Sequence, residues 1–510
     1  MDERFLMRIG GRAVPAHDGA VLHSFEPATR RRLAELPSGG PEDVRRAVAA
    51  ARHAFDEGPW PRMPAAERAA LLRAVARRVD AASESLARWE ARDNGATLRK
   101  ALGADVPGAA AAFEWSAWWA EQLPERQPAA GDGAPGPYAV WRPVGVVAAI
   151  VPWNLPLLLA AWRIAPAIAA GNTCVVKPAS FASLSVLELV RLLHECGLPP
   201  GVVNVVTGPG AGTGEALVRS PGVDLVSFTG SDGTGAAVRQ GADAAGTPAR
   251  LDLGGKSPQL VLADADVQRA VTGVAWGAFL HNGQVCMAGS RAVVHRDVHE
   301  EFLGLLAERV GRLRVGDPLD PATDLGPLVS RSQARTARRF TALGLSQGAR
   351  LVCGGRAPGG GELPDGLDPA AYHLPTVLAS VRPDDAVAQE EIFGPVLSVI
   401  RADSDEDAVR IANGTRYGLS AGVWSADPGH ARAVAEELRA DRVWINDYRI
   451  VDLERPDPRR PQDAVWTRLT NELDAYRRRH AVIVTEHTDG AAGAGGSRLL
   501  PPTPYALLGS

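Results

Sequence analysis

Cys286 is the residue of this sequence that is best suited to covalent chemistry. It closes the run Gly283-Gln284-Val285-Cys286, and Met287-Ala288-Gly289-Ser290 follows it. Glycine lets a backbone approach a ligand closely, and a cysteine thiolate attacks carbonyl carbons. A lone cysteine is also commonly inert packing, so this segment by itself leaves both interpretations open.

Two polar residues stand in apolar surroundings where each needs a partner. Asn154 lies between Pro152 and Pro156 in an apolar run, and Asp252 lies between two leucines before a Gly-Gly turn. A buried amide can brace a turn or donate to an oxyanion, and a buried carboxylate can anchor a loop or act as a base with a raised pKa. With Cys286 they supply the nucleophile, oxyanion donor and base that acyl transfer to sulfur needs.

A glycine-rich turn runs from Phe228 to Gly235, between a predicted strand and a helix predicted to begin at Ala236. Amides at the start of a helix attract phosphate, but this spacing is not the G-x-G-x-x-G fingerprint, and a purely structural turn fits equally well. Lys177 ends another predicted strand, at the edge where open parallel sheets bind ligands. Its ammonium group can contact a ribose or a phosphate, or it can simply be solvated.

Helical periodicity and short apolar strands alternate along the chain. This alternation predicts parallel βαβ units and a doubly wound sheet. Helices are predicted over residues 43–55, 65–93, 183–196, 214–219, 267–280 and 299–313, and strands over 144–151, 174–176, 201–206, 223–228, 292–295 and 442–446.

Gross composition excludes several classes of protein. The net charge of −4 argues against extensive binding of nucleic acid or an anionic membrane. Four cysteines in 510 residues do not indicate a disulfide framework, so a cytoplasmic location is expected. The apolar run over 145–162 is long enough to suggest a membrane span, but Pro152 and Pro156 favour a buried strand, a loop and a helix.

Together these runs resemble the aldehyde dehydrogenase superfamily. The resemblance covers residues 25–447 and returns at 473–485. Six short motifs occur in that family's order: PWN (152–154), KPA (177–179), FTGS (228–231), LGGKSP (253–258), GQVC (283–286) and EEIFGP (390–395).

The resemblance implies an α/β fold with a Rossmann-like cofactor domain, an α/β catalytic domain and a small β-strand oligomerisation arm. A homodimer or homotetramer is expected, because exposed strand edges pair with other strands. The implied boundaries are 1–121 and 144–253 for the cofactor domain, 254–447 for the catalytic domain, 122–143 and 472–487 for the arm, 448–471 for a divergent segment and 488–510 for a flexible tail.

By the same resemblance, Cys286 is the nucleophile, the Asn154 amide and the Cys286 backbone N–H hold the oxyanion, and Asp252 activates the water that hydrolyses a thioester. The oxidant is NAD or NADP and the substrate a small aldehyde, with no metal ion, nucleic acid or membrane involved. The positions matching cofactor contacts are Trp153, Lys177, Ser180, Gly210, Phe228, Gly230, Ser231, Gly235, Glu391 and Phe393.

Three departures from the family pattern bear on these expectations. Asp252 stands where a glutamate is usual, which shortens the side chain by about 1.5 Å. Asp252→Glu is therefore expected to raise turnover if the shorter carboxylate limits deacylation. Ser180 replaces a glutamate of many NAD-preferring members, which removes a charge that repels the 2′-phosphate of NADP. Residues 456–463 replace a glycine-rich segment near the substrate entrance with charge and proline.

The leading hypothesis is NAD(P)-dependent oxidation of an aldehyde to its acid through a thiohemiacetal and a thioester on Cys286. One alternative passes the acyl group to coenzyme A or another thiol, and a second is a weakly active partner protein that keeps the fold. Trp162, Val285 and Met287 suggest an apolar aldehyde pocket or ordinary core packing. His281 either tunes the thiol or, as is more usual for a loop histidine, is solvated.

Overall fold

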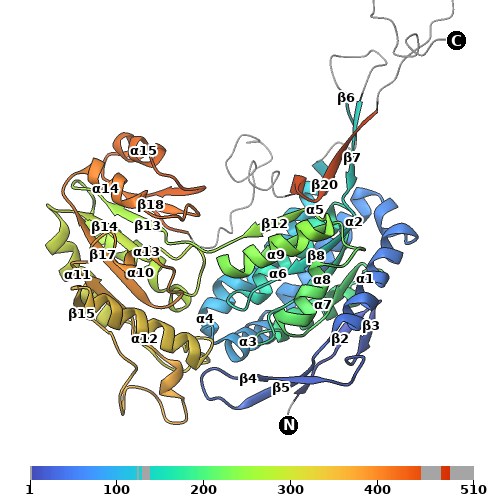
Figure 1. Ribbon diagram of the computed structural model, residues 1–510, viewed down its shortest axis with the longest axis horizontal. Coiled ribbons are helices and arrows are strands. Elements are labelled where there is room, and N and C mark those ends of the chain that lie inside the picture. Colours follow the sequence, from blue (N-terminus) through green and yellow to red (C-terminus); the bar gives the residue numbers. More distant parts are fainter. Residues whose placement is uncertain (1–2, 123–125, 129–137, 450–472, 483–510) are drawn as a thin grey trace, which may run out of the picture. The chain divides into compact units, whose positions relative to one another are not determined.

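The computed structural model describes residues 3–122, 126–128, 138–449 and 473–482. Two seven-stranded sheets contain most of its strands (Figure 1). The strands of the first sheet, in spatial order, are β12 (Ala249–Asp252), β11 (Leu225–Thr229), β8 (Val146–Ile150), β9 (Thr173–Lys177), β10 (Val203–Val205), β2 (Met7–Ile9) and β3 (Arg12–Val14).

Side chains alternate between the two faces of this first sheet, and each face has its own helices. Val147 and Ala149 join a core with α6 (Pro156–Ala169) and α7 (Leu184–Glu195). The intervening strand residues join a second core, to which α1 (Pro41–Asp56) and α9 (Asp232–Ala245) contribute. Parallel strands covered on both faces are buried along their length, as β8, β9 and β11 are.

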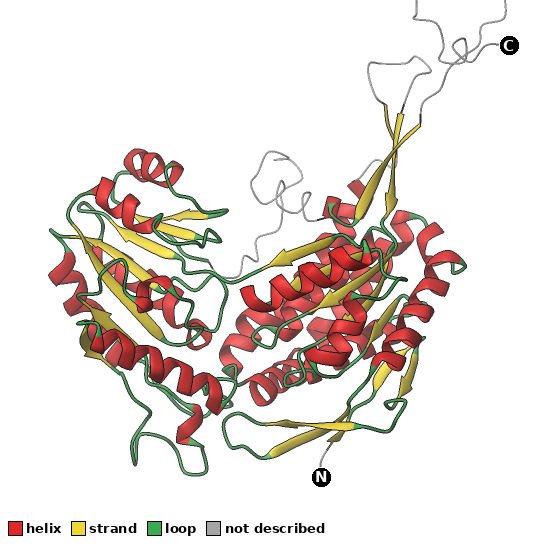
Figure 2. Ribbon diagram, viewed as in Figure 1, coloured by secondary structure: helices red, strands yellow, loops and turns green. Residues whose placement is uncertain are grey.

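The second sheet is built on the same plan (Figure 2). Ala292 and Val294 face a core with α10 (Val267–Phe279) and α11 (His299–Gly311), and Val293 faces another core. That other core includes α12 (Arg331–Ser346), α14 (Asp405–Ala412) and α15 (Pro428–Glu436). The strands, in order, are β15 (Arg350–Cys353), β16 (Thr376–Ala379), β17 (Val396–Ala402), β14 (Arg291–His295), β13 (Pro258–Val261), β18 (Ala421–Trp424) and β19 (Val443–Ile445).

Two three-stranded sheets accompany the large ones. The first contains, in spatial order, β1 (Glu3–Arg4), β5 (Arg32–Pro37) and β4 (Val21–Phe25). The second contains β20 (Arg477–Val482), β7 (Tyr138–Pro143) and β6 (Arg126–Pro128). By contacts the chain divides into one unit of residues 1–123 and 143–478 and a second, small unit of 124–142 and 479–510. The remaining helices are α2 (Ala65–Ala81), α3 (Ser83–Asn94), α4 (Leu98–Lys100), α5 (Val106–Gln122), α8 (Glu215–Val218) and α13 (Ala386–Gln389), with short 3-10 or π turns at Trp60–Arg62, Ala101–Asp105, Gly210–Gly214, Leu280–Gly283 and Pro369–Ala371.

The predicted elements are largely confirmed, with two corrections. The helical run predicted over 65–93 is two helices, α2 and α3, separated at Ala82. The helix predicted from Ala236 begins earlier, at Asp232, because Ser231 is extended and the helix starts directly after it. The apolar run over 145–162 forms β8, a loop and the start of α6, as expected. Within the described ranges no helix combines the length and hydropathy that a membrane crossing requires.

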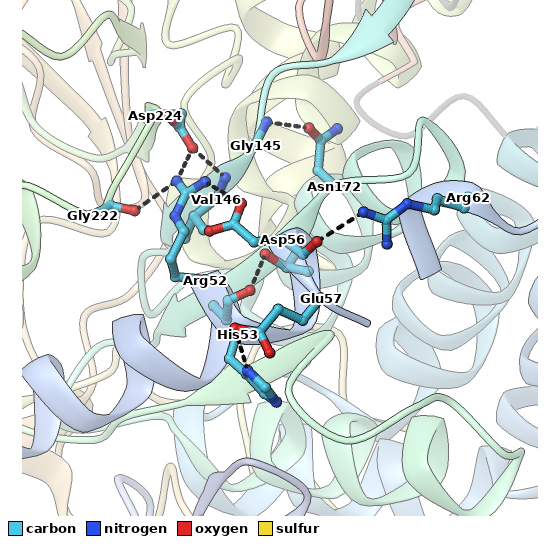
Figure 3. Close-up of polar contacts among 12 residues, drawn as sticks. Arg52, His53, Asp56, Glu57, Arg62, Gly145, Val146, Asn172, Gly222 and Asp224 are labelled. Carbon is cyan, nitrogen blue, oxygen red and sulfur yellow. Dashed lines mark hydrogen bonds and ion pairs between the residues drawn. The ribbon is translucent and has the colours of Figure 1, made fainter. Parts of the chain in front are cut away.

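A polar network at the start of β8 ties this strand to α1 (Figure 3). Asp224 accepts the Val146 N–H at 2.7 Å and an ion-pairing hydrogen bond from Arg52 of α1. Arg52 also donates to the Gly222 carbonyl at 3.0 Å, and the Gly145 N–H donates to Asn172 at 2.9 Å. The network therefore fixes the strand starts, whereas Lys177 and Asp252 lie at strand ends of the same sheet.

Gly145→Ala is expected to lower the free energy of unfolding by about 3 kcal/mol. Gly145 has φ +136°, and an added Cβ would overlap the Asp224 carboxylate that anchors β8. Thermal denaturation of the variant should show a clear drop in the midpoint. Gly304→Ala is the matched control, because Gly304 is an exposed residue inside α11 with open space around it, and there alanine should stabilise by about 0.5–1 kcal/mol. Equal midpoints for the two variants would contradict the argument.

Candidate active site

The loop that carries Cys286 is held in a fixed shape by its own amide side chains. The Asn282 amide donates to the carbonyls of Gly326 and Pro327, both at 3.0 Å. Gln284 accepts the Val329 N–H at 3.0 Å and donates to the His281 carbonyl at 3.2 Å. The side chains of Asn282 and Gln284 are both buried, whereas Cys286 itself is half-buried. The loop therefore presents its sulfur from a rigid support.

Asn154 reaches this loop from the start of α6. The Asn154 side chain is 3% exposed, and its amide nitrogen donates to the Gln284 carbonyl at 2.8 Å. The sequence left open whether this amide braces a turn or serves an oxyanion. The hydrogen bond shows the bracing contact directly, and because an amide NH₂ carries two hydrogens, the second remains for a substrate oxygen. The contact places Asn154 two residues from Cys286 along the loop.

Glu391 lies close to the nucleophile, next to the Gly254–Gly255 turn. Its carboxylate accepts the Gly255 N–H at 3.3 Å, and a Cβ on Gly255 would lie 2.8 Å from the Cys286 carbonyl oxygen. Burial raises the pKa of Glu391 to about 7. Burial, and then the negative charge of Glu391, raise the pKa of the Cys286 thiol to about 11, while the charge of Arg163 acts in the opposite direction. Without a further positive charge the cysteine is a thiol at neutral pH.

Asp252 ends β12 and forms an ion pair with Arg163, which was not among the predicted site residues. Arg163 of α6, with a side chain only 10% exposed, forms an ion-pairing hydrogen bond to the Asp252 carboxylate and donates to the Thr229 hydroxyl at 2.7 Å. The signal was available, because Arg163 is a lone charge in a helix that is otherwise almost entirely apolar and buried, and such a charge needs a partner. Asp252 is thus a paired carboxylate, not an isolated one in an apolar loop.

Lys177 occupies the predicted place at the end of β9. The Lys177 side chain is buried, and its ammonium group donates to the Pro178 carbonyl at 2.8 Å. Burial lowers the pKa of Lys177 to about 8. Its stem lies 3.5 Å from the point where a Cβ on Gly214 would stand, so the turn that begins at Gly210 runs beside it. Ser180, three residues on, is half-buried.

The glycine-rich turn has a partly structural explanation. A Cβ on Gly230 would meet the ring of Phe228, and one on Gly235 would meet the side chain of Leu253, so the packing of the chain itself requires both glycines. The first turn of α9 is nevertheless open to solvent at Ser231 and Gly233, and no side chain caps it. Uncapped amides of this kind are where an anion binds.

Aromatic rings gather beside Asn154. The ring of Trp153 lies 5.2 Å from that of Phe393 in an edge-to-face arrangement and 6.1 Å from that of Phe181. Phe393 has φ +54° and is held there by Gln333, which donates to its carbonyl at 2.9 Å. Phe181 is 45% exposed and was not among the predicted site residues.

Two further residues correct or extend the predicted site. His281 is not solvated: it is 5% exposed, and burial holds its pKa well below the usual value. Tyr448 was not predicted, yet its hydroxyl donates to the Met287 carbonyl at 2.7 Å and lies 3.2 Å from Ser420. Both residues pack against the loop of Cys286, so they act on the shape and solvation of that loop.

The residues present fit a pyridine dinucleotide. A buried lysine at a strand end, an uncapped helix start and an open space beside Gly210 suit the phosphates and ribose. Glu391 has its carboxylate near both Gly255 and Cys286, at the position where the family resemblance predicts a contact with the nicotinamide ribose. The loops that carry Asn154, Cys286 and Glu391 thus lie next to one another.

Comparison with known proteins agrees with this geometry. Residues 14–457 match the model of the aldehyde dehydrogenase family. The chain is 39% identical over 452 residues to the NADP/NAD-dependent aldehyde dehydrogenase PuuC of Escherichia coli (strain K12), which covers 88% of this chain and 89% of that protein. It is 37% identical over 449 residues to the betaine aldehyde dehydrogenase of Bacillus subtilis (strain 168), covering 86% and 89%. The solved betaine aldehyde dehydrogenase of Staphylococcus aureus in complex with NAD+ superposes with a TM-score of 0.86 at 31% identity, covering 94% of each chain. The chain belongs to the aldehyde dehydrogenase family.

Proposed function

We propose that this protein oxidises an aldehyde to a carboxylic acid with NAD or NADP, through covalent intermediates on Cys286. The observation that carries the proposal is the meeting of three loops at one sulfur. The Cys286 loop is braced by the Asn154 amide, and the turn at Gly255 joins it to Glu391. A nucleophile, an oxyanion donor and a cofactor-side carboxylate are the groups that this chemistry requires.

The chemistry begins at the Cys286 sulfur. The thiolate attacks the aldehyde carbon, a C–S bond forms, and the carbonyl electron pair moves to oxygen, where the Asn154 N–H and the Cys286 backbone N–H stabilise it. Each such donor contributes on the order of 10²–10³ in rate. Bound NAD(P)+ supplies a positively charged ring that favours the thiolate and accepts the hydride. The resulting thioester is cleaved by water, with the thiolate leaving and the acid released.

Asp252 is proposed as the base for that water, held by Arg163. Arg163 also affects the thiol, since its charge lowers the pKa of Cys286. We therefore treat Arg163 as a positioning residue for both steps.

Ser180 and the open helix start support use of both NAD and NADP. The half-buried hydroxyl of Ser180 offers no negative charge against a 2′-phosphate. The PuuC relative is named for both cofactors, which supports the same proposal here. The strand edges of the β20–β7–β6 sheet support a homodimer or homotetramer, and four free cysteines support a reducing cytoplasmic location.

One assay tests the function. Purified protein is mixed with a panel of aldehydes and NAD+ or NADP+, with and without coenzyme A, and reduced cofactor is followed by absorbance. Turnover without coenzyme A is expected. Turnover that depends on coenzyme A would instead assign acyl transfer to a thiol. If no aldehyde of the panel is oxidised but the cofactor still binds, the protein keeps the fold without the activity.

Cofactor affinity is expected to weaken as the pH rises above about 8. Lys177 is protonated below its pKa of about 8 and neutral above it, and only the protonated form attracts an anionic cofactor. The dissociation constant should therefore rise by up to about tenfold per pH unit above that value. Calorimetric titration of NAD+ between pH 7 and pH 10 measures it. The Lys177→Met variant should bind NAD+ more weakly, and its dissociation constant should not rise in this way with pH. A variant with the same pH profile as wild type would show that Lys177 does not contact the cofactor.

A further inference from the structure

The helix that follows Asn154 begins without a capping side chain of its own. Leu155 is the N-cap of α6, Pro156 has no N–H, and the Leu159 N–H already donates to the Leu155 carbonyl at 2.9 Å. The Leu157 N–H has no acceptor within the helix, because the first turn lacks the preceding carbonyls. The group that accepts this N–H therefore bears on how the chain passes from Asn154 into α6.

That acceptor is Glu90 of α3, which lies 67 residues earlier in the chain. Its carboxyl group accepts the Leu157 N–H at 3.2 Å and the Asn94 amide at 3.1 Å, and the residue is fully buried. Asn94 is itself held in one orientation, since its oxygen accepts the Ala96 N–H at 2.7 Å. Glu90 thus caps α6 from another helix with a carboxyl group that is bonded at both oxygens.

Asn154 lies between this cap and the Cys286 loop. Its amide donates to the Gln284 carbonyl at 2.8 Å, and three residues further along the chain the backbone is held by Glu90. The remaining amide hydrogen is the one proposed for the oxyanion. A donor of this kind is effective only at a fixed place, and a displacement of about 1 Å can cost on the order of 10²-fold in rate. The cap therefore bears on the reaction through Asn154.

Two charged side chains lie near Glu90. Lys100 and Asp105 are buried and pair with each other at 2.7 Å. Burial, and then the negative charge of Asp105, raise the pKa of Glu90 to about 8, while the positive charge of Lys100 acts in the opposite direction. At neutral pH the Glu90 side chain is therefore mostly uncharged, and glutamine is a close substitute for it in both charge and reach.

We propose that Glu90 is a positioning residue for the oxyanion donor: it holds the start of α6 and so fixes the Asn154 amide against the Cys286 loop. The inference rests on the proposed function, since it concerns the same Asn154 amide. Glu90 acts only through the protein, because a fully buried side chain cannot touch the aldehyde. Its effect should therefore appear in the rate of acylation and not in the binding of the cofactor.

The test compares three substitutions at Glu90, with acylation followed by stopped-flow absorbance of the reduced cofactor. Glu90→Gln keeps the acceptor for the Leu157 N–H, so acylation should stay within about threefold of wild type. Glu90→Asp withdraws the carboxyl group by about 1.5 Å, and Glu90→Met removes it. Both should slow acylation by about tenfold to a hundredfold and leave NAD+ affinity, measured by calorimetry, within about twofold. The opposite order, with Glu90→Asp the most active variant, would indicate a role of charge and overturn the proposal.

A double-variant cycle separates positioning from general destabilisation. If Glu90 acts through Asn154, Glu90→Asp should slow acylation by less than about threefold in the Asn154→Ala background. An equal factor in both backgrounds would overturn the proposal.

Asp93→Leu is the matched control. Asp93 is a second buried carboxyl group of α3, and it accepts the Leu184 N–H at the start of α7 at 2.8 Å. Its replacement should lower the thermal midpoint and leave acylation at saturating NAD+ within about twofold. A loss as large as that of Glu90→Met would show that any missing cap slows the reaction, and would count against Glu90.

A ligand that needs no cofactor keeps the test decisive if no aldehyde is oxidised. With hexyl trifluoromethyl ketone, the Cys286 thiolate adds to the ketone carbon, a C–S bond forms and the carbonyl electron pair moves to oxygen, with no leaving group. This oxyanion needs the same donor, so titration by fluorine NMR should find an adduct in wild type and one about tenfold weaker in Glu90→Asp. That result without turnover would contradict the proposed oxidation alone. Equal affinity in both proteins, or no adduct in wild type, would overturn the role of Glu90.

Discussion

Replacing Cys286 by alanine is expected to lower steady-state formation of reduced cofactor by about four orders of magnitude or more. The reason is that both covalent intermediates are bonded to this sulfur, so no other group of the site replaces its chemistry. Because the loop is held by Asn282, Gln284 and Asn154 and not by the thiol, the variant should fold normally. Absorbance of the reduced cofactor gives the rate, and calorimetry should find NAD+ binding retained.

Thiol chemistry provides an independent check on the same residue. The pKa of Cys286 is about 11 in the protein alone, because the partial burial of this residue and then the nearby charge of Glu391 disfavour the thiolate. Alkylation by iodoacetamide, followed by mass spectrometry, should therefore rise with pH toward that value as the thiolate fraction increases. Addition of NAD+ should move the profile to lower pH. Cys353→Ala is the control, since this half-buried cysteine lies on β15 and is no part of the site. If the Cys286→Ala variant kept turnover near the wild-type level, the proposed mechanism would be contradicted.

The second large effect concerns Asp252 and Arg163 as a pair. Asp252→Asn is expected to lower steady-state turnover by about 10²–10³ while leaving a burst of roughly one reduced cofactor per site, because acylation proceeds and hydrolysis of the thioester does not. Stopped-flow absorbance resolves the burst from the slow phase. A variant that loses the burst as well would show that Asp252 acts before the thioester forms.

The ion pair changes what is expected of Asp252→Glu. From the sequence alone, the longer side chain should raise turnover if the shorter carboxylate limits deacylation, and a drop would mean that the pocket is adapted to aspartate. In the structure, the guanidinium of the buried Arg163 already pairs with the shorter carboxylate, so an added methylene would move the carboxylate away from this paired position. We therefore expect Asp252→Glu alone to lower turnover by about tenfold, since a misplacement of about 1 Å carries a large cost.

A double variant isolates this coupling. Lysine is shorter than arginine, so Arg163→Lys should make room for the glutamate. The pair Asp252→Glu with Arg163→Lys is expected to recover turnover to within about threefold of wild type, although each single change lowers it. The thermodynamic cycle should give a coupling energy of about 1–3 kcal/mol. Additive effects, or higher turnover in Asp252→Glu alone, would show that Arg163 does not set the position of the base.

Much of the fold could be predicted from the sequence, because the patterns that indicate strands and helices are local. The alternation of apolar strands such as 174–176 with amphipathic helices such as 267–280 predicts parallel units, and β9 and α10 confirm both. Where the signal was weak, the prediction failed: the first turn of α9 contains two glycines, and a glycine-rich run does not look helical. The short strands near the N-terminus, β1 to β5, were not predicted, because a few residues of pleated pattern are hard to distinguish from loop.

The sequence by itself determined the chemical inventory of this protein. The family, and with it the reaction, could be predicted from the types and order of a few residues: Asn154, Lys177, Cys286 and Glu391. These residue types are the ones that thiol-based oxidation needs. Only the tertiary structure decided how these groups affect one another. Arg163 meets Asp252 across 89 residues of chain, and Glu391 meets Gly255 across 136. Charge pairing and burial depend on distances in space, and separation along the chain does not encode them.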